Sequence, residues 1–326
     1  MQKIKIGIMG GAGYTGGELL RVLLRHSNAH ISFVHSTSNA GELLSKVHTD
    51  LMGETDLKFA SELDQNIDVL FLCVGHGDAK KFLAINEIKS SIKIIDLSQD
   101  FRLAENAVVG DRQFVYGLPE LNKASIVAAQ NIANPGCFAT AIQLSLLPLA
   151  AQGALADVFT TGITGSTGAG QSLTATNHFS WRANNIQAYK TLQHQHIHEI
   201  GQSLNQLQAN KKAAVHFVPW RGDFTRGIFV SSVLSSNLSL EALYEMYENY
   251  YAKAAFTQVS KNNIDLKQVV NTNKCLIHIE KQVDKIAIHA VLDNLLKGAV
   301  GQAVQNMNLI FGLDETTGLQ LKANYF

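Results

Sequence analysis

The fold is decided by Lys3-Ile-Lys-Ile-Gly-Ile-Met9 and by the turn Gly10-Gly-Ala-Gly13-Tyr-Thr-Gly16 that follows it. The first segment is rich in isoleucine, which is typical of a buried strand. Glu18 to His26, after the turn, carries leucines at helical spacing. Glycines between a strand and a helix let backbone N–H groups approach a pyrophosphate at the helix N-terminus. The pattern predicts a dinucleotide site at Gly10, Gly13 and Gly16; a tight turn that binds nothing is the alternative.

Further apolar runs continue this pattern through about residue 135. Ile31 to His35, Asp68 to Val74 and Ile92 to Asp96 are typical of strands, and the second run is continuously apolar. Such runs indicate strands buried on both faces of a parallel sheet. Strands that alternate with helices predict an α/β fold with a Rossmann-type, doubly wound nucleotide-binding domain.

The second half has a different pattern, which predicts an α+β catalytic domain with a mixed or antiparallel sheet. Its expected strands are longer and partly alternating, at residues 158–163, 213–218, 227–234, 275–280 and 285–292. Helical spacing is found at residues 191–208 and 240–255, and a last helix is expected over 298–311. The change of pattern therefore marks a domain boundary near residue 135.

Composition and charge exclude several classes of protein. The chain has 326 residues, with 27 basic and 27 acidic side chains and 46% hydrophobic residues. A balanced charge argues against nucleic-acid or anionic-membrane partners, and no apolar stretch approaches the ~20 residues of a membrane span. The N-terminal segment lacks the apolar core of a signal peptide, and three cysteines do not form a disulfide framework. We therefore expect a cytoplasmic enzyme with a small-molecule substrate.

The segment after the second strand bears on cofactor choice. It reads His35-Ser-Thr-Ser-Asn39, without the acidic residue that hydrogen-bonds the ribose of NAD and repels a 2′-phosphate. The hydroxyls of Ser36 and Ser38 suit a phosphate, which favours NADP. A polar loop that selects neither cofactor is the alternative.

Cys137 is the candidate nucleophile. In Asn134-Pro-Gly-Cys137, Asn134 is suited to cap a helix and Pro135 to its first position. Cys137 then lies in the first turn, where free N–H groups and the helix dipole favour the thiolate. Cys73 and Cys275 sit in apolar runs and are expected to be inert core residues.

Three histidines stand close together in His194-Gln-His196-Ile-His198-Glu199. His196 and Glu199 are three residues apart on one helical face, so Glu199 is placed to orient the imidazole for acid–base catalysis. A metal site and solvated surface histidines are the alternatives, and the segment lacks common zinc-ligand spacing. No metal is expected.

Two further features suit anions. The loop Gly162 to Gly170, which includes Gly168, is rich in glycine, serine and threonine and suits an anion or the nicotinamide amide, or is simply a flexible turn. Arg102 and Arg226 are isolated cations in apolar surroundings. Each suits a phosphate or carboxylate, with a buried structural ion pair as the alternative.

Five segments together resemble one family, the N-acetyl-γ-glutamyl-phosphate reductases of arginine biosynthesis. They are the glycine turn with Tyr14, Thr15, Glu18 and Leu19; Ile95 to Leu103; Tyr116 to Leu121; Asn134 to Cys137; and Asp293 to Leu309. The resemblance covers essentially the whole chain. It implies reduction of the acyl phosphate by NADPH to N-acetylglutamate semialdehyde through a thioester on cysteine. It also implies a fold related to aspartate-semialdehyde and glyceraldehyde-3-phosphate dehydrogenases.

The resemblance assigns roles to individual residues. It implies Cys137 as nucleophile, His196 as acid–base and Glu199 as its support. The implied cofactor residues are Gly10, Gly13, Tyr14, Thr15, Gly16, Ser36, Ser38, Gly168 and Asn294, and the implied substrate residues are Arg102, Arg226 and His194. It also implies an NADP-binding domain of residues 1–135 and 298–326, a catalytic and dimerisation domain of residues 136–297, and a homo-oligomer, either dimer or tetramer.

The chain departs from the family at three places. Where the family usually has His-Arg-His-x-Pro-Glu, this chain has His194-Gln-His-Ile-His-Glu199. Ser36-Thr37 stands where the family usually has Ser-Arg, which removes a 2′-phosphate contact. The segment Pro219 to Arg226 contains Arg221, for which the family offers no role. We expect Arg221 either to pair with Asp223 or to bind a second carboxylate, such as that of an N-succinyl group. Aspartate-semialdehyde dehydrogenase and a non-catalytic dinucleotide sensor are the other candidate functions.

Overall fold

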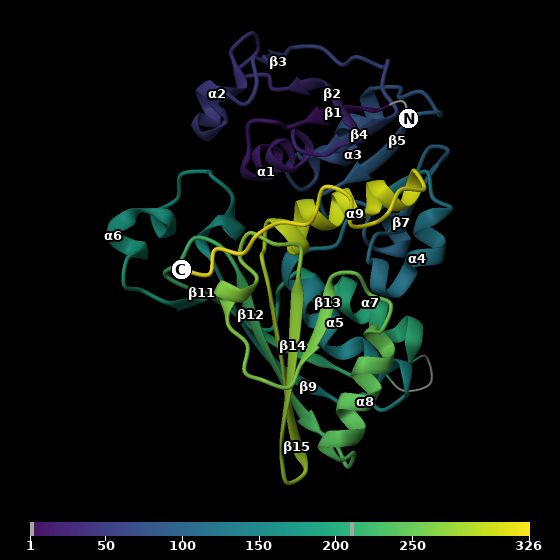
Figure 1. The fold of residues 1–326 in the computed structure, drawn as a ribbon, viewed down its shortest axis with the longest axis vertical. Helices are drawn as coiled ribbons and strands as arrows, with labels where there is room; N and C mark the ends of the chain where they lie inside the picture. The colour runs from purple at the N-terminus through teal and green to yellow at the C-terminus, as the bar shows by residue number, and fades with distance from the viewer. Residues whose placement is uncertain (1–2, 209–211) are drawn as a thin grey trace. The chain divides into compact units, whose positions relative to one another are not determined.

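A computed structural model describes residues 3–208 and 212–326 and divides them into two compact units (Figure 1). The first unit consists of the N-terminal part of the chain up to Pro135 together with Ala299–Gln320. The second unit holds Gly136–Gly298 and Leu321–Phe326. The tail after Gln320 therefore differs from the sequence-based division, because the backbone of Asn324 donates to Val270 O in the second unit.

The first unit contains, within the described residues, an eight-stranded sheet in the order β3-β2-β1-β4-β5-β8-β7-β6. Its members are β1 (Ile4–Met9), β2 (Ala29–His35), β3 (Phe59–Ala60), β4 (Val69–Leu72), β5 (Lys93–Asp96), β6 (Val108–Val109), β7 (Arg112–Tyr116) and β8 (Asn131–Ala133). All neighbours pair in parallel except β6 and β7. The predicted doubly wound, largely parallel sheet is confirmed.

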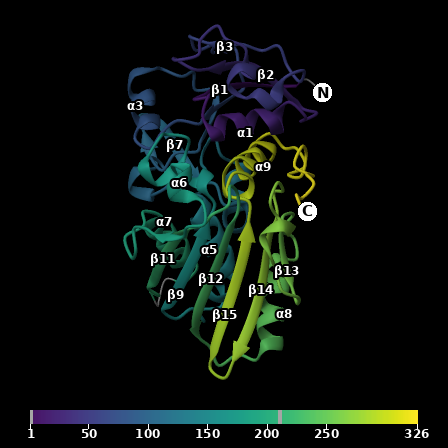
Figure 2. The ribbon, with the colours of Figure 1, turned by 90° about the vertical axis from the view of Figure 1, so that its left-hand side faces the viewer.

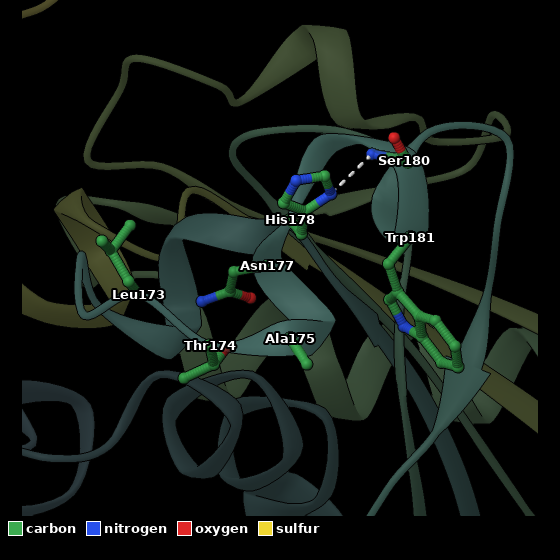
Figure 3. A pocket seen from close by; sticks show the side chains of 7 residues that line it. All are labelled: Leu173, Thr174, Ala175, Asn177, His178, Ser180 and Trp181. Atoms are coloured by element: carbon green, nitrogen blue, oxygen red, sulfur yellow. Dashed lines mark hydrogen bonds between the residues drawn. The ribbon is translucent and has the colours of Figure 1, made fainter.

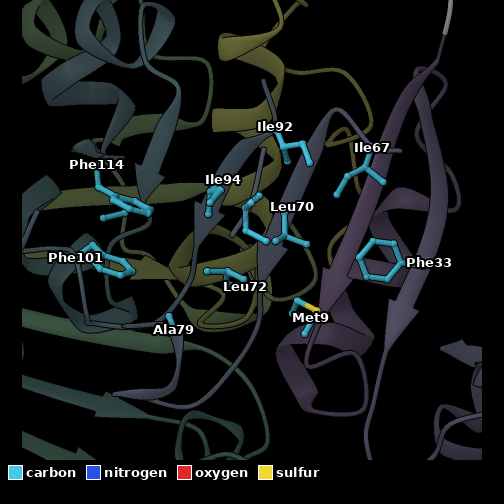
Figure 4. Close-up of a cluster of buried hydrophobic side chains, with 12 residues drawn as sticks. Met9, Phe33, Ile67, Leu70, Leu72, Ala79, Ile92, Ile94, Phe101 and Phe114 are labelled. Atoms are coloured by element: carbon cyan, nitrogen blue, oxygen red, sulfur yellow. The ribbon is translucent and has the colours of Figure 1, made fainter. Parts of the chain in front are cut away.

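Apolar side chains pack along this sheet in a buried cluster (Figure 4). Leu70, Leu72 and Ile94 come from the central strands, and Phe101 stacks on Phe114 with ring centroids 4.2 Å apart. Helix α1 (Tyr14–Leu23) buries its leucines in the same unit. This helix begins earlier than residue 18, since Gly13 is its N-cap.

The second unit contains, over the residues that the structure describes, a seven-stranded mixed sheet in the order β10-β11-β9-β12-β15-β14-β13 (Figure 2). Its members are β9 (Val158–Thr164), β10 (Gln187–Ala188), β11 (Val215–Arg221), β12 (Ile228–Ser235), β13 (Thr257–Ser260), β14 (Cys275–Gln282) and β15 (Lys285–Leu292). The pairs β9–β11 and β13–β14 are parallel and the others antiparallel. The predicted α+β domain is confirmed.

Helices α5 (Cys137–Ala151), α7 (His196–Leu207) and α8 (Leu240–Tyr251) pack against this sheet. β12 alternates buried and partly exposed residues, as expected for a sheet with one covered face. Helix α5 is apolar nearly all round and almost entirely buried, as is typical of a central helix. Helix α7 begins at His196 rather than at residue 191, so His196 and His198 lie in its first turn and His194 precedes the helix.

The expected C-terminal helix is a π-helical turn at Leu296–Val300 followed by α9 (Gly301–Ile310). Every residue of α9 is buried. Several polar side chains on it form hydrogen bonds, as when Asn306 Nδ2 donates to Gly117 O at 2.8 Å.

Candidate active site

Cys137 is the first residue of α5, the central helix of the second unit. Gly136 is the N-cap, with φ −72° and ψ 153°, so the sequence-based choice of Asn134 as the cap is wrong. The helix begins two residues further on, and the Asn134 side chain donates instead to Ala299 O at 2.9 Å. Cys137 nonetheless lies in the first helical turn, where backbone N–H groups favour a thiolate.

His196 and Glu199 occupy the first turn of α7 and are both buried. The imidazole Nε2 of His196 lies 3.7 Å from Oε1 of Glu199. That separation is longer than a hydrogen bond but close enough for the carboxylate to stabilise a protonated imidazole. The predicted pairing of these two residues on one helical face is present.

The start of α5 is tied to this pair. The backbone N–H of Gly136 donates to Glu199 Oε2 at 3.1 Å. A Cβ placed on Gly136 would lie 2.3 Å from His196 Nε2, so the imidazole rests directly against the backbone before Cys137. Gly298 also approaches the nucleophile closely, since its Cβ would lie 2.8 Å from Cys137 Cβ. The sequence alone did not single out either glycine as a site residue, although Gly136 directly precedes Cys137 and Gly298 follows Asn294 by four positions.

His194 and Tyr189 extend the site away from the helix start. His194 Nδ1 accepts the backbone N–H of His196 at 3.2 Å. Burial, with a smaller contribution from Lys190, lowers the pKa of His194 to about 4, so this imidazole is neutral at pH 7. Tyr189 packs edge-on against His194 with ring centroids 5.8 Å apart. His194 therefore adjoins His196 as a neutral group, and Tyr189 is a site residue that sequence reasoning missed.

Arg226 forms a structural ion pair, one of its two sequence-based interpretations, although its own side chain is only partly buried. Its Nη2 lies 3.0 Å from Oδ2 of Asp293, whose side chain is fully buried. Asp293 also accepts the backbone N–H groups of Leu295 and Leu296, just before the π-helical turn. Arg226 thereby stabilises the segment that carries Gly298.

Asn294 and Gly168 lie in the same unit and share a neighbour. Asn294 Oδ1 accepts the backbone N–H of Gly227 at 2.7 Å, and its Nδ2 donates to Thr167 Oγ1 at 3.0 Å. A Cβ on Gly168 would come within 4.0 Å of the Asn294 amide. Asn294 thus fastens the predicted glycine-rich loop, and its contact with the cofactor remains a prediction.

Arg102 lies in the first unit and is buried. Its Nε donates to Asn134 O at 2.8 Å, and its Nη2 donates to Leu97 O at 3.1 Å. These bonds fix the segment that leads to Pro135. Its predicted contact with phosphate remains a prediction.

The glycine turn of the first unit fits a pyrophosphate. Gly10 has φ +78°, and its Cβ would lie 2.4 Å from Cys73 O, so only glycine is accommodated without strain. A Cβ on Gly16 would lie 2.6 Å from Gly10 O, so a side chain at residue 16 would clash with the backbone of the turn. Within the described chain, no side chain caps α1 and its first turn carries no acidic residue, so its N–H groups remain available for an anion. Tyr14 is exposed and Thr15 half-buried beside this turn.

The candidate 2′-phosphate loop follows β2. Asn39 Nδ2 donates to Ser36 Oγ at 3.1 Å and to Ser38 Oγ at 3.0 Å. Each hydroxyl then accepts one bond and keeps its own proton to donate. Asn39 therefore orients the two serines that the sequence singled out, and Thr37 between them is exposed.

Comparison with known proteins identifies the chain. Family models match residues 5–129 as "Semialdehyde dehydrogenase, NAD binding domain" and residues 137–294 as "Semialdehyde dehydrogenase, dimerisation domain". Proteins named N-acetyl-gamma-glutamyl-phosphate reductase are 56% identical in Bacteroides fragilis and 55% in Bacteroides thetaiotaomicron, each over 99% of this chain and 100% of the relative. The chain belongs to the N-acetyl-gamma-glutamyl-phosphate reductase family. A member from Christiangramia forsetii is 52% identical over 99% of this chain and 100% of its own length.

Solved structures share the fold of this reductase family. Aspartate semialdehyde dehydrogenase II from Vibrio cholerae superposes with a TM-score of 0.74, covering 96% of this chain and 99% of its own, at 16% identity. Aspartate semialdehyde dehydrogenase with NADP from Candida albicans gives a TM-score of 0.67 at 13% identity, covering 95% and 99%. At these identities the likeness concerns the fold alone.

Two features of the described residues bear on alternatives raised by the sequence. Among residues 3–208 and 212–326, no cluster of three or more His, Cys, Asp or Glu side chains is placed to hold a metal ion. Over that same part of the chain, no helix has the length and apolarity needed to span a membrane.

Proposed function

We propose that this chain reduces N-acetyl-γ-glutamyl phosphate to N-acetylglutamate semialdehyde and inorganic phosphate with NADPH, as a step of arginine biosynthesis. The observation that carries the proposal is Cys137 at the start of α5, with His196 and Glu199 fastened to the preceding residue. The identity of 52–56% to reductases of that name supports the substrate.

The first step is acyl transfer to Cys137. Its thiolate Sγ forms a bond to the acyl carbonyl carbon, and the bond from that carbon to the phosphate oxygen breaks, which leaves a thioester and inorganic phosphate. Backbone N–H groups in the first turn of α5 are the available donors for the tetrahedral oxyanion. The fixed Gly136 backbone keeps this turn in place.

The second step is reduction of the thioester. NADPH, when bound, supplies the hydride that reduces the carbonyl carbon. His196, protonated and stabilised by Glu199, donates a proton to the oxygen as the thiohemiacetal forms. It then accepts that proton as the C–S bond breaks and the aldehyde leaves. Glu199 acts through His196 and Gly136, so we assign it a positioning role.

We assign cofactor binding to residues of the first unit and a substrate contact to the second. The turn Gly10 to Gly16 would hold the pyrophosphate of NADP, and Ser36 with Ser38 its 2′-phosphate. His194, as a neutral imidazole beside His196, would donate from Nε2 to the substrate.

We propose a cytoplasmic homo-oligomer that associates through the second unit. The family model for residues 137–294 is a dimerisation domain. The sheet of that unit exposes large apolar side chains, Phe159 at 66% and Val233 at 40% of their surface. Exposed apolar side chains on one sheet face suit burial against a second copy.

The test is turnover of the purified chain in the reverse direction. We expect phosphate-dependent reduction of NADP with N-acetylglutamate semialdehyde, and much weaker turnover of aspartate semialdehyde. Turnover that needs no phosphate, or a preference for aspartate semialdehyde, would contradict the proposal.

A further inference from the structure

Arg221 ends β11 and does not form the surface pair with Asp223 that the sequence suggested as one alternative. Asp223 Oδ2 instead accepts the backbone N–H of Asn184 at 2.5 Å. In the described part of the chain, neither Arg221 nor its neighbour Arg182 forms a salt bridge with a carboxylate. The solvated ion pair is therefore wrong as an account of Arg221.

The guanidinium of Arg221 is instead held over an aromatic ring. Its Cζ lies 4.9 Å from the ring centroid of Tyr189, and its Nη1 donates to Asn177 Oδ1 at 3.5 Å. Its Nε is buried and, among the described residues, has no hydrogen-bond partner. A buried N–H without an acceptor is costly, so a carboxylate oxygen that reached this N–H would form a favourable hydrogen bond.

A second cation raises the positive potential here. Arg182 is buried, and its donors go to backbone carbonyls, Nε and Nη2 to Thr176 O and Nη1 to Arg221 O. Burial and the charge of Arg221 both lower the pKa of Arg182. Among the described residues, the charges that act on Arg182 are those of Arg221 and Asp223, so two guanidinium groups share one nearby carboxylate.

The group of Arg221, Arg182 and Tyr189, here called the Arg221 cluster, is linked to the nucleophile through a chain of ring contacts. Tyr189 contacts His194, and the His194 and His196 rings lie 4.5 Å apart between centroids. Burial, and then the neighbouring charge of Cys137, raise the pKa of the Tyr189 phenol far above its usual range, whereas Arg221 opposes that shift. Asn177 also lines a cavity of about 700 Å³ (Figure 3). Open space therefore adjoins the Arg221 cluster.

We propose that Arg221, with Asn177 beside it, binds a carboxylate of the substrate. This inference rests on the proposed function, and it assigns to Arg221 the carboxylate contact that the sequence offered as one alternative for Arg226. Arg226 already faces both oxygens of buried Asp293, so its charge is balanced within the chain. Arg221 retains an unbalanced charge and a planar fork, which suits a carboxylate bound through two oxygens.

An N-acylglutamyl substrate offers two sources for that carboxylate. The α-carboxylate is present whatever the acyl group is, whereas an N-succinyl group adds a second one. The experiment compares three aldehydes in the phosphate-dependent oxidation: N-acetylglutamate semialdehyde, N-succinylglutamate semialdehyde, and 4-acetamidobutanal, which has no carboxylate. The variants are Arg221→Gln and Arg221→Lys, with Arg25→Gln, an exposed arginine paired with Glu54, as the matched control.

We expect Arg221→Gln to lower kcat/KM for a carboxylate-bearing substrate by about 10- to 150-fold, mostly through KM, as for a lost hydrogen bond to a charged group. Arg221→Lys should recover part of the loss. If kcat/KM falls equally for both N-acylglutamate semialdehydes and is unchanged for 4-acetamidobutanal, Arg221 binds the α-carboxylate. If kcat/KM falls only for the N-succinyl substrate, Arg221 binds the carboxylate of the acyl group. Equal losses for all three aldehydes, or none, would overturn the proposal.

Two further measurements keep the test decisive. Asn177→Asp places a negative charge beside Arg221 on a half-buried loop and should reproduce the selective loss if Arg221→Gln does not fold. If the parent oxidises none of the aldehydes, the proposed function fails, and calorimetric binding of N-acetylglutamate and N-succinylglutamate still tests Arg221. Binding that is equal in the parent and in Arg221→Gln would then reject the carboxylate site.

Discussion

The contact between Gly136 and His196 gives a sharp test of the site. In Gly136→Ala the new Cβ would lie 2.3, 2.6 and 2.7 Å from three atoms of the buried imidazole. Ordinary contacts are about 3.5 Å or more, so the ring or the helix start must shift by roughly 1.2 Å. The backbone angles of Gly136 are allowed for alanine, so the strain is purely one of packing.

This displacement sets the expected magnitude. Overpacking of a well-packed site costs about 1–3 kcal/mol of unfolding free energy. A misplacement of about 1 Å in a catalytic group costs on the order of 10²-fold in rate. We therefore expect Gly136→Ala to fold with a modestly lower Tm, to bind NADP normally through the first unit, and to lose about 100-fold in kcat.

The matched control is Gly201→Ala in α7, the helix that carries His196. A Cβ on Gly201 meets nothing within 4 Å, so the same chemical change in a helix interior should leave activity unchanged and raise stability by about 0.5–1 kcal/mol. Steady-state oxidation of the semialdehyde and thermal melts measure both variants.

A double-mutant cycle isolates the cause. His196→Ala alone should lower kcat by about 10²–10⁴-fold. If Gly136→Ala acts by displacing the imidazole, adding it to His196→Ala should cost little more. The reasoning would be refuted if the loss of kcat in the double variant equalled the product of the two single-variant losses. It would also be refuted if Gly136→Ala kept more than a third of the parent activity.

Three other predictions concern the nucleophile, the cofactor and the first unit. Cys137→Ala should keep NADP binding but lose turnover and rapid alkylation, because burial raises the pKa of the Cys73 thiol well above its usual value; fast labelling of Cys73 would contradict this. Thr37→Arg should raise the ratio of kcat/KM for NADPH over NADH by about tenfold, since a charged donor bonds phosphate more strongly; a parent that prefers NADH would refute it. Burial raises the pKa of Asp96 to about 7, above its unfolded value near 3.9, so the folded state binds the extra proton. The unfolding free energy should then fall as pH rises from about 4 to about 7, and urea melts of Asp96→Asn should show a smaller fall.

The local sequence pattern was sufficient to predict those features of this protein that depend on residues close together in the chain. The isoleucine strand and glycine turn predicted a parallel nucleotide-binding sheet because buried strands and pyrophosphate turns impose local constraints. The first-turn position of Cys137 and the shared face of His196 and Glu199 also follow from helix geometry. Even where the cap was misplaced, the error was two residues, since Asn, Pro and Gly all suit a helix start.

Only the tertiary structure decided which distant residues meet. The bond from Gly136 to Glu199 spans 63 positions, and nothing in either local sequence encodes the approach. Arg226 and Arg221 look alike in sequence, yet one is balanced by Asp293 and the other stands over Tyr189. The charge that a side chain presents to a ligand depends on what the rest of the chain packs against it, and that is set by the fold rather than by the neighbours in sequence.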